Sequence, residues 1–336
     1  MGKYRKIYVL APAGKATGGV ELSHQLVDYL NKNGCEAYIV YVNGNSIVPR
    51  AEVPDVYRKY QISTSDSIED APDNMLILPE IYFDYIYRYP AIRIGCWWMS
   101  VDNHYYSACL GDMLRFYGIW TDKAYTLYRY LKGEIHFRNS LSDLRDQSDR
   151  IVHLYQSVYA QQHLYSIGMK TVLPLSDYIN PELFAVRKVE KENLVLYNPK
   201  KGGKYVEKLK KYLPGVRFIP LMGLSREELN ALLDRAKVYV DFGAFPGKDR
   251  IPREAVIHGC CLITGRFGAS AFYEDVPVPE EYKFEMGHAA PWDRISALIR
   301  DVFADYGKHF KAGDFMRERI MGEQDAFYRE ANALFL

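Results

Sequence analysis

The sequence predicts an α/β protein with two doubly wound domains, each a parallel sheet covered by helices. First, its 336 residues exceed what one hydrophobic core usually holds, about 100–200 residues. Second, short apolar runs alternate with amphipathic segments in both halves, as buried parallel strands alternate with covering helices. Third, this rhythm restarts after a stretch rich in proline, serine and aspartate at 174–181. We therefore predict domains at 1–178 and 179–336, with a ligand cleft between them.

The N-terminal half opens with a strand, a helix and a second strand. An apolar strand at 7–10 is followed at 20–33 by apolar residues near helical spacing, and Gly34 favours a helix end there. A strand at 37–42 completes this βαβ unit. The other elements expected in this half are strands at 75–78, 92–99, 119–120, 151–155 and 171–173 and a helix at 158–166.

The C-terminal half repeats the pattern. A strand at 194–197 precedes a helix at 204–212. Ser225 and Glu228 have the spacing of a capping box, which predicts the start of a helix at 226–235. The other elements expected here are strands at 216–221, 238–242 and 261–264, a helix at 253–258, and helical segments from Trp292 and at 314–336.

Composition and charge restrict the classes of partner. The 43 Lys and Arg residues nearly cancel the 42 Asp and Glu residues, so net charge points neither to nucleic acid nor to strong membrane attraction. No run approaches the ~18–20 apolar residues of a spanning helix, and the basic start lacks the apolar core of a signal peptide. The 5 cysteines lack CxxC spacing, which is typical of buried thiols in a reducing compartment. We expect a cytoplasmic protein, and leave open a peripheral contact with the inner face of the membrane.

A glycine loop at 14–19 is the first candidate for a binding site. It lies where the first strand turns into the first helix, so the amides near Gly18 and Gly19 and the helix dipole could face an anion. The spacing fits neither a dinucleotide-binding loop nor a P-loop. A plain turn is an equally good interpretation.

Polar residues follow two later strands of the same half. Asp102 and His104 come after the apolar run 92–99, at a carboxyl end where side chains in such folds face the ligand. Either residue could act as a base or bind a sugar hydroxyl, and a helix cap is equally plausible. Glu80, just after the strand at 75–78, invites the same two interpretations, with the structural one slightly favoured.

The sequence offers no metal motif. It contains no Asp-X-Asp pair and no HExxH, and its 8 histidines are scattered without ligand spacing. We therefore expect no metal and no bound cofactor. A departing phosphate group would then be stabilised by lysine, arginine and helix N-termini.

Basic and glycine-rich loops of the C-terminal half are the strongest candidates for an anion site. The segment 199–204 follows one strand and opens a helix, and the longer segment 241–255 does the same after another. For the shorter segment alone, a solvated charge run would be the better interpretation. The residues predicted to bind the donor are Lys201, Gly202, Gly247, Asp249, Arg253, Glu254 and Gly268, with Lys248 as a catalytic candidate.

These segments resemble the donor-binding motifs of the retaining GT-B glycosyltransferases in the large family often called family four. In that family a glutamate at a helix start holds the ribose of the nucleotide, so the resemblance of 252–263 implies this role for Glu254. Lys201-Gly202 resembles the family's donor-phosphate motif, and Gly18-Gly19 resembles its loop near the transferred sugar. The resemblance implies two Rossmann-like domains, the first for the acceptor and the second for the nucleotide-sugar. It also implies that the last helix packs back on the first domain.

The sequence departs from the family pattern at two positions. Family members commonly carry a second glutamate eight residues before the ribose glutamate, and Pro246 stands there. Pro199 lies near the place of an arginine that precedes the family's Lys-Gly pair. Lys248 and Asp249 are therefore candidates for the contacts to the sugar.

Together these features predict a metal-independent glycosyltransferase. A nucleoside diphosphate sugar would donate a glycosyl unit to a hydroxyl of a saccharide or lipid-linked acceptor, with retention implied by the resemblance alone. Lys201, Lys248 and Arg253 are the candidates for neutralising the diphosphate. Asp102 and His104 are the candidates on the acceptor side. Two alternatives stay open: a catalytically silent sugar-nucleotide-binding subunit, suggested by the missing glutamate, and a GT-B-like sugar-nucleotide epimerase.

Overall fold

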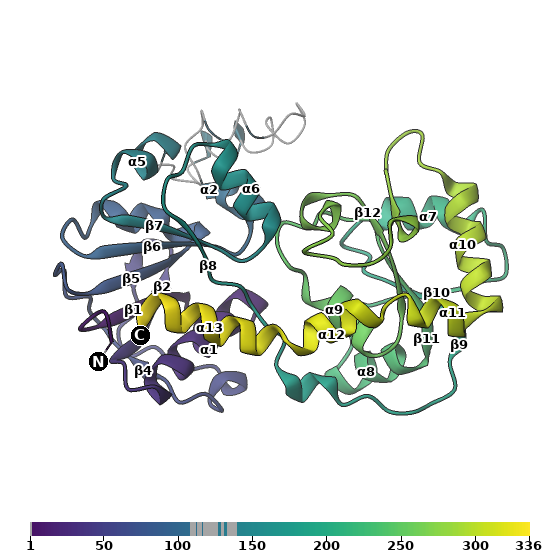
Figure 1. The fold of residues 1–336 in the computed structure, drawn as a ribbon, viewed down its shortest axis with the longest axis horizontal. Helices are drawn as coiled ribbons and strands as arrows, with labels where there is room; N and C mark the ends of the chain where they lie inside the picture. Colours follow the sequence, from purple (N-terminus) through teal and green to yellow (C-terminus); the bar gives the residue numbers. More distant parts are fainter. Residues whose placement is uncertain (1, 108–111, 113–115, 117–126, 129–130, 133–139) are drawn as a thin grey trace. The chain divides into compact units, whose positions relative to one another are not determined.

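The computed structural model describes residues 2–107, 112, 116, 127–128, 131–132 and 140–336. Within it the chain divides into two compact units (Figure 1). Unit 1 comprises Met1–Asp177 and Ala326–Leu336, and unit 2 comprises Tyr178–Asp325. Each unit has its own largely parallel sheet.

Among the described residues, unit 1 forms an eight-stranded sheet in the order β3-β2-β1-β5-β6-β7-β8, with β4 paired to β2. Every pairing is parallel except that of β2 with β3. The chain runs from β1 to β2 on one side and continues at β5 on the other, so β1 and β5 flank the topological switch point, where open α/β sheets bind ligands. The strands are β1 (Ile7–Pro12), β2 (Ala37–Asn43), β3 (Ser46–Ile47), β4 (Ser63–Thr64), β5 (Met75–Pro79), β6 (Arg93–Trp98), β7 (Ile151–Tyr155) and β8 (Val172–Pro174).

The helices of unit 1 pack on this sheet through apolar side chains. α1 covers β1 and β2, and α6 covers β7 and β8. Leu10, Leu76 and Trp98 belong to one buried cluster, which sets the spacing between sheet and helices. The helices are α1 (Gly18–Lys32), η1 (Asp55–Tyr57), η2 (Glu80–Tyr87), α2 (Val101–Ser107), α5 (Leu141–Asp146) and α6 (Val158–Ser166), followed late in the chain by α13 (Glu323–Phe335).

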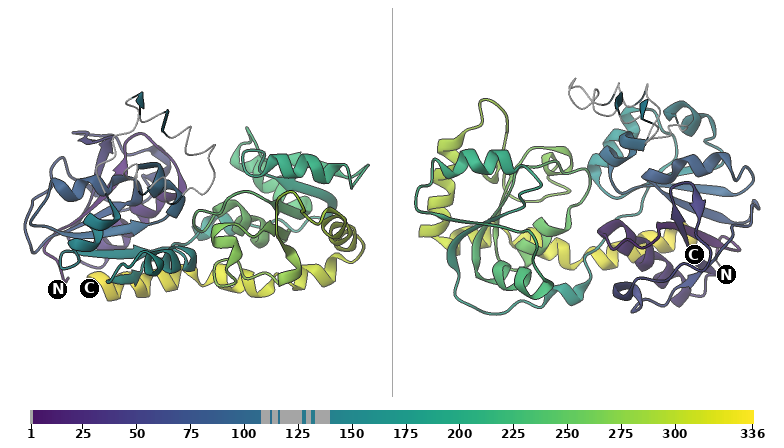
Figure 2. Two further views of the ribbon diagram at one scale, coloured as in Figure 1. Left: turned by 90° about the horizontal axis from the view of Figure 1, so that it is seen from above. Right: turned by 180° about the vertical axis from the view of Figure 1, so that it is seen from behind.

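The end of α13 joins unit 1 beside the start of the chain (Figure 2). The Lys3 amide donates to the Phe335 carbonyl at 2.9 Å. Farther back along the helix, the ring of Tyr328 stacks on Tyr29 of α1 with centroids 4.0 Å apart. Glu330 accepts hydrogen bonds from the Ser176 amide and hydroxyl at 2.6 and 2.7 Å. The last eleven residues are therefore fixed to both ends of the unit 1 segment.

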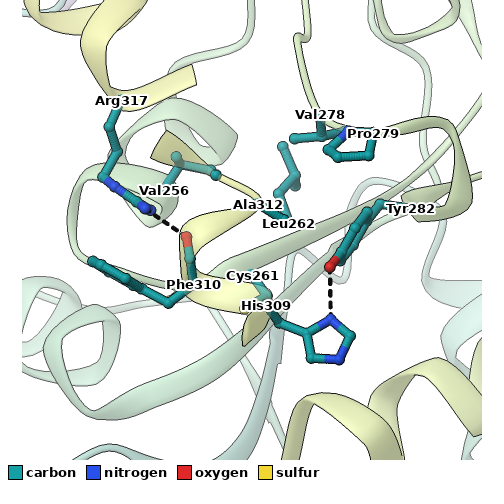
Figure 3. A pocket seen from close by; sticks show the side chains of 12 residues that line it. Val256, Cys261, Leu262, Val278, Pro279, Tyr282, His309, Phe310, Ala312 and Arg317 are labelled. Carbon is teal, nitrogen blue, oxygen red and sulfur yellow. Dashed lines mark hydrogen bonds between the residues drawn. The ribbon is translucent and has the colours of Figure 1, made fainter. Parts of the chain in front are cut away.

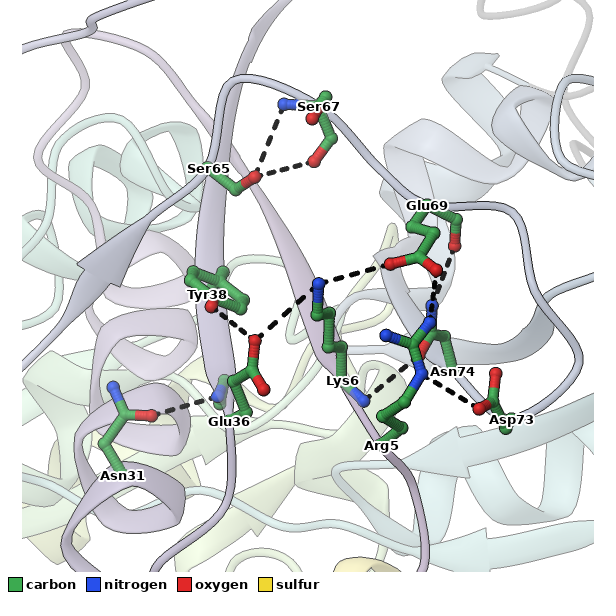
Figure 4. A network of polar contacts seen from close by, with 11 residues as sticks. Arg5, Lys6, Asn31, Glu36, Tyr38, Ser65, Ser67, Glu69, Asp73 and Asn74 are labelled. Carbon is green, nitrogen blue, oxygen red and sulfur yellow. Dashed lines mark hydrogen bonds and ion pairs between the residues drawn. The ribbon is translucent and has the colours of Figure 1, made fainter.

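Charged residues hold together the amino-terminal ends of the unit 1 strands (Figure 4). Just before β1, Arg5 pairs with Glu69 and with Asp73, the latter at 2.9 Å. Lys6 lies 3.2 Å from Glu69 and 3.8 Å from Glu36. Lys6 is partly exposed and the other groups are well exposed, so each pair adds little stability. These pairs lie at the amino-terminal edge of the sheet. The candidate site residues lie at the opposite edge, which the carboxyl ends of the strands form.

Unit 2 forms a five-stranded parallel sheet in the order β10-β9-β11-β12-β13, counted over the described residues. Its switch point lies between β9 and β11, because the chain runs from β9 to β10 on one side and continues at β11 on the other. The strands are β9 (Glu192–Tyr197), β10 (Arg217–Pro220), β11 (Ala236–Asp241), β12 (Cys261–Gly265) and β13 (Lys283–Phe284).

The helices of unit 2 follow these strands in alternation. α8 packs on β9, α9 packs on β11 and β12, and α10 packs on β11 and α7. Ser225 accepts from the Glu228 amide, and the Glu228 carboxylate accepts from the Ser225 amide, which confirms the predicted capping box. The helices are η3 (Pro181–Phe184), α7 (Gly203–Lys210), α8 (Arg226–Arg235), α9 (Arg250–Ile257), η4 (Gly268–Ala271), η5 (Glu280–Tyr282), α10 (Trp292–Ala304), α11 (Tyr306–Lys311) and α12 (Asp314–Met321).

The predicted α/β class with parallel sheets is confirmed, and two local predictions need correction. α9 begins at Arg250, before the predicted start at Arg253. Pro252 lies in its first turn, where a backbone amide has no partner within the helix, so a proline is tolerated there. The helical segment predicted at 314–336 is two helices, separated at Gly322. The short helix α11 was not predicted. The strand predicted at 119–120 lies outside the described residues.

Candidate functional site

The loops that leave β9 and β11 lie side by side at the switch point of unit 2. The two strands pair in parallel, with Tyr197 opposite Val240. The residues that follow each strand therefore emerge at the same carboxyl edge. One loop carries Lys201 and Gly202 into α7, and the other carries residues 242–249 into α9.

The two loops approach each other so closely that glycine is required. Gly202 has a φ of +71°, and a Cβ atom there would lie 2.5 Å from the carbonyl carbon of Phe242. A Cβ atom on Gly243 would in turn lie 2.6 Å from Cβ of Lys201. These approaches are below any normal contact distance, so the two backbones pack directly on one another. The structure thus brings the predicted Lys-Gly segment onto the predicted donor loop.

Lys201 extends along this loop contact. Its Nζ forms an ion pair with Asp249 and donates to the Ala244 carbonyl at 3.3 Å. The same Nζ lies 5.8 Å from the ring centroid of Phe245. The side chain is partly exposed, so its charge can still reach an anion at the edge of the sheet.

Lys248 and Arg253 share one carboxylate. Lys248 Nζ lies 2.8 Å from Glu323 Oε1, and Arg253 Nη1 lies 2.6 Å from Glu323 Oε2. Arg253 also donates through Nε to the Asp249 carbonyl at 3.2 Å and through Nη2 to the Lys248 carbonyl at 3.0 Å. Arg253 is 3% exposed and is committed to protein acceptors. Arg253 therefore stabilises the conformation of the loop, and the direct phosphate contact expected from the sequence does not suit its position.

Glu254 lies one residue further along α9 and is 2% exposed. Its Oε2 accepts from Arg226 Nη1 of α8 at 2.6 Å, and its Oε1 lies 3.9 Å from Arg250 Nε. Arg226 of α8 therefore supplies a charge-assisted hydrogen bond to this buried carboxylate.

Asp241, the last residue of β11, is a buried carboxyl at the same edge that the sequence analysis assigned no role. It accepts from the Tyr239 hydroxyl at 3.0 Å and from the Gly243 amide at 3.1 Å. Burial raises the pKa of Asp241 to about 6, and the nearby charge of Lys201 opposes this rise. Its position at the carboxyl end of the apolar run 238–240 was the signal that could have identified it.

The two remaining donor-side glycines lie on or next to the same loop. Gly247 is buried within it. Gly268 has a φ of +53° and begins η4, whose Ala269 amide donates to the Phe245 carbonyl at 2.8 Å. The turn after β12 is therefore fixed to the donor loop.

The unit 1 candidates also converge at a switch point. Gly19 lies in the first turn of α1, where a Cβ atom would approach Sδ of Met99 to 3.2 Å. The Met99 amide donates to Glu80 Oε2 at 3.2 Å, and Asn103 Nδ2 donates to Glu80 Oε1 at 3.5 Å. Gly18 is the first residue of α1, next to Gly19. The loop after β1, the residue after β5 and the residues after β6 therefore meet at one edge of the sheet.

Glu80 and Asp102 have different surroundings at this edge. Burial raises the pKa of Glu80 to about 7, only partly offset by hydrogen bonds from the backbone and Asn103. A carboxyl with such a pKa can exchange a proton near neutral pH. Asp102 accepts from the Tyr159 hydroxyl of α6 at 3.2 Å. Both side chains are positioned by neighbouring strands and helices rather than by a free loop.

His104 is fully buried and lies against aromatic rings. Its ring centroid is 4.5 Å from that of Trp98 and 5.2 Å from that of Phe83. Burial lowers the pKa of His104 to about 3, so the ring is neutral at physiological pH. Enclosed in this way, His104 is part of the core of unit 1, and the acceptor-side role expected from the sequence does not suit its position.

Neither a metal cluster nor a spanning helix is found in the described part of the chain. No group of three or more His, Cys, Asp or Glu side chains gathers there in a way that could hold a metal ion. Over the same residues, no helix combines the length and the apolar character needed to cross a membrane.

A separate small cavity in unit 2 is lined by side chains of α9, β12, η5, α11 and α12 (Figure 3). Its free volume is about 10 Å³, room for one water molecule at most. Tyr282 and His309 hydrogen bond at 2.6 Å on one side, and Arg317 donates to the Phe310 carbonyl at 2.5 Å on the other. These contacts join α11 to η5 and α12 to α11, so the cavity is a packing feature of this unit.

Comparisons with known proteins find the fold but no relative by sequence. No family model matches the chain, and no curated protein matches it. Among solved structures, sucrose-phosphate synthase from Thermosynechococcus elongatus matches with a TM-score of 0.61, 12% identity and coverage of 98% of both chains. Anabaena HepE in complex with UDP-glucose matches with a TM-score of 0.56 and 10% identity, over 98% of this chain and 97% of that one.

The catalytic domain of starch synthase IV from Arabidopsis thaliana, bound to ADP and acarbose, matches over 99% of this chain and all of that domain. Its TM-score is 0.51 and its identity is 10%. These neighbours are GT-B glycosyltransferases. At such low identity the likeness establishes that this chain has their fold.

Proposed function

We propose that this protein is a glycosyltransferase that uses a nucleoside diphosphate sugar as donor. The observation that carries the proposal is the switch point of unit 2, where Lys201 and Gly202 pack against the loop that bears Lys248 and Asp249. Cationic side chains and loop amides at the carboxyl edge of a parallel sheet are suited to a diphosphate. Among the structural neighbours, HepE is described in complex with UDP-glucose and starch synthase IV with ADP and acarbose.

In this proposal the donor binds through its diphosphate and its ribose. Lys201 and Lys248 neutralise the charge that develops on the departing diphosphate, which lowers the barrier most where water is excluded. Glu254 accepts hydrogen bonds from the ribose hydroxyls, since each carboxylate oxygen has two acceptor sites. Arg226 is the mobile partner: its side chain is 42% exposed and can move aside when the ribose takes over Glu254.

The acceptor is proposed to bind at the carboxyl edge of the unit 1 sheet. Asp102 and Glu80 are the candidates for contacting its hydroxyl groups, and the turn at Gly18 and Gly19 allows a close approach of backbone to sugar. The acceptor class is a saccharide or lipid-linked saccharide. We further propose that transfer needs no metal and proceeds with retention, as in the family that the donor motif resembles.

A direct test combines binding and turnover. The protein is screened by thermal shift against UDP, ADP, GDP, TDP and their common sugars, because a ligand selective for the folded state raises apparent stability. The stabilising donor is then incubated with protein, with and without oligosaccharide acceptors, and the released nucleoside diphosphate is measured. Release that depends on acceptor is expected. Binding without any turnover would favour a silent sugar-nucleotide-binding subunit, and donor isomerised without acceptor would favour an epimerase.

A further inference from the structure

Glu323 pairs with two cations, Lys248 of the donor loop and Arg253 of α9. Its two carboxylate oxygens are divided between them, with Oε1 at 2.8 Å from Lys248 and Oε2 at 2.6 Å from Arg253. Glu323 is 6% exposed and the Lys248 side chain is 12% exposed. Ion pairs enclosed to this degree keep a fixed geometry, in contrast to pairs in water.

Arg253 makes this arrangement rigid. Its three nitrogens donate to Glu323, to the Lys248 carbonyl and to the Asp249 carbonyl. A guanidinium held at all three nitrogens has little freedom, so it fixes the Glu323 carboxylate. The second oxygen of that carboxylate then presents a defined anchor to Lys248.

A lysine that an ion pair already holds in place binds phosphate at a lower cost in entropy. Its side chain loses considerable rotamer entropy on being immobilised, and prior immobilisation removes part of that cost from binding. In protein kinases a lysine that contacts nucleotide phosphates is oriented in this way by a glutamate on a neighbouring helix. Lys248 adjoins Asp249, the ion-pair partner of Lys201, so Glu323 lies at the end of a chain of contacts that includes both proposed phosphate ligands.

We infer that Glu323 is a positioning residue that orients Lys248 toward the diphosphate of the donor. The inference rests on the proposed function, since it assigns Lys248 a phosphate contact. Glu323 itself touches no substrate in this scheme. It is the first residue of α13, so the start of that helix carries the carboxylate that orients Lys248.

The test measures the affinity of UDP, ADP and their nucleosides by calorimetry for the full chain and for variants. Glu323→Gln keeps the shape of the side chain and removes its charge. It should weaken binding of the preferred nucleoside diphosphate about tenfold, the value of one charge-assisted hydrogen bond, and leave nucleoside binding unchanged. Glu323→Asp, which keeps the charge but shortens the reach, should lose less.

Lys248→Met completes a double-mutant cycle. If Glu323 acts through Lys248, the double variant should bind diphosphate no more weakly than Lys248→Met alone. A merely structural role for Glu323 would lower nucleoside and diphosphate affinity together and give additive losses. Glu318→Gln, on the exposed side of α12, is the matched control and should bind like the unmodified protein.

The failure of this inference is distinguishable from that of the proposed function. If the unmodified protein binds no nucleoside diphosphate, the proposed function fails and takes the inference with it. If it binds diphosphate and Glu323→Gln binds equally well, or more tightly, the inference is overturned while the function stands. Should Glu323→Gln not fold, the same comparisons are made with Glu323→Asp, and undiminished diphosphate affinity in that variant would equally overturn the inference.

Discussion

Glu254 Oε2 lies 2.6 Å from Arg226 Nη1, so an almost fully buried carboxylate on α9 has a partly exposed guanidinium on α8 as its counter-ion. This relationship has a functional consequence in the proposed donor site. A buried carboxylate requires a hydrogen-bonding partner at all times. When a ribose is bound its hydroxyls can supply that partner, and in the free protein Arg226 does so.

The first prediction concerns this carboxylate. Glu254→Gln should weaken binding of the preferred nucleoside diphosphate by about tenfold, because a charged acceptor of ribose hydroxyls becomes neutral. The corresponding 2′,3′-dideoxy nucleotide should bind the variant and the unmodified protein almost equally. Calorimetric titration with both nucleotides checks this, and equal losses for the two would remove Glu254 from the ribose site.

The second prediction concerns the contact between the two loops. Gly202→Ala should destabilise the protein by about 1–3 kcal/mol or more, because alanine is strained at a φ of +71° and its Cβ would clash with Phe242. Gly203→Ala is the matched control. A Cβ atom at Gly203 meets nothing within 4 Å, and this glycine starts α7, so stability should change by no more than about 0.5 kcal/mol. Denaturant unfolding of both variants measures the difference. Similar stabilities would show that Gly202 does not approach Phe242 closely.

The third prediction concerns the pH dependence of stability. Burial raises the pKa of Glu80 from 4.5 to about 7, so between these values the folded state binds more protons at this group than the unfolded state. Its contribution to the free energy of unfolding therefore falls as pH rises through this window and is lost above pH 7. Glu80→Gln cannot ionise, so its stability relative to the unmodified protein should be higher at pH 8 than at pH 5.

Denaturant unfolding at both pH values measures this difference. Glu52→Gln, which changes an exposed carboxylate, serves as control and should show the same relative stability at pH 5 and pH 8. A Glu80→Gln variant whose relative stability is independent of pH would mean that Glu80 is ionised in the folded protein with an ordinary pKa.

Much of the fold follows from patterns of side chains along the sequence. The apolar runs at β5 and β7 predicted strands because buried parallel strands are apolar on both faces. The start of α8 was predictable because Ser225 and Glu228 satisfy the first amides of the helix locally. Short edge strands such as β3 and β4 carry too few apolar residues for their pairing to be visible in this way.

The candidate site was predictable only in part, because some of its contacts join distant parts of the chain. Lys201 and Asp249 could be proposed from their loops, but their ion pair depends on the order of β9 and β11 in the sheet. Glu323 lies 70 residues from Arg253, and no local pattern marks their contact. The acceptor-side role predicted for His104 came from its position after a strand. That position does not reveal that the ring faces Trp98 in the core.

The diphosphate site proposed for unit 2 is tested most directly by Lys201→Ala. Calorimetry measures how this variant binds a nucleoside diphosphate and its nucleoside. Lys201 is assigned to the phosphates alone. The affinity of the variant for the diphosphate should fall about tenfold or more, and its affinity for the nucleoside should be nearly unchanged. Equal affinities of the variant and the unmodified protein for the diphosphate, or equal losses for both ligands, would contradict the proposed diphosphate site.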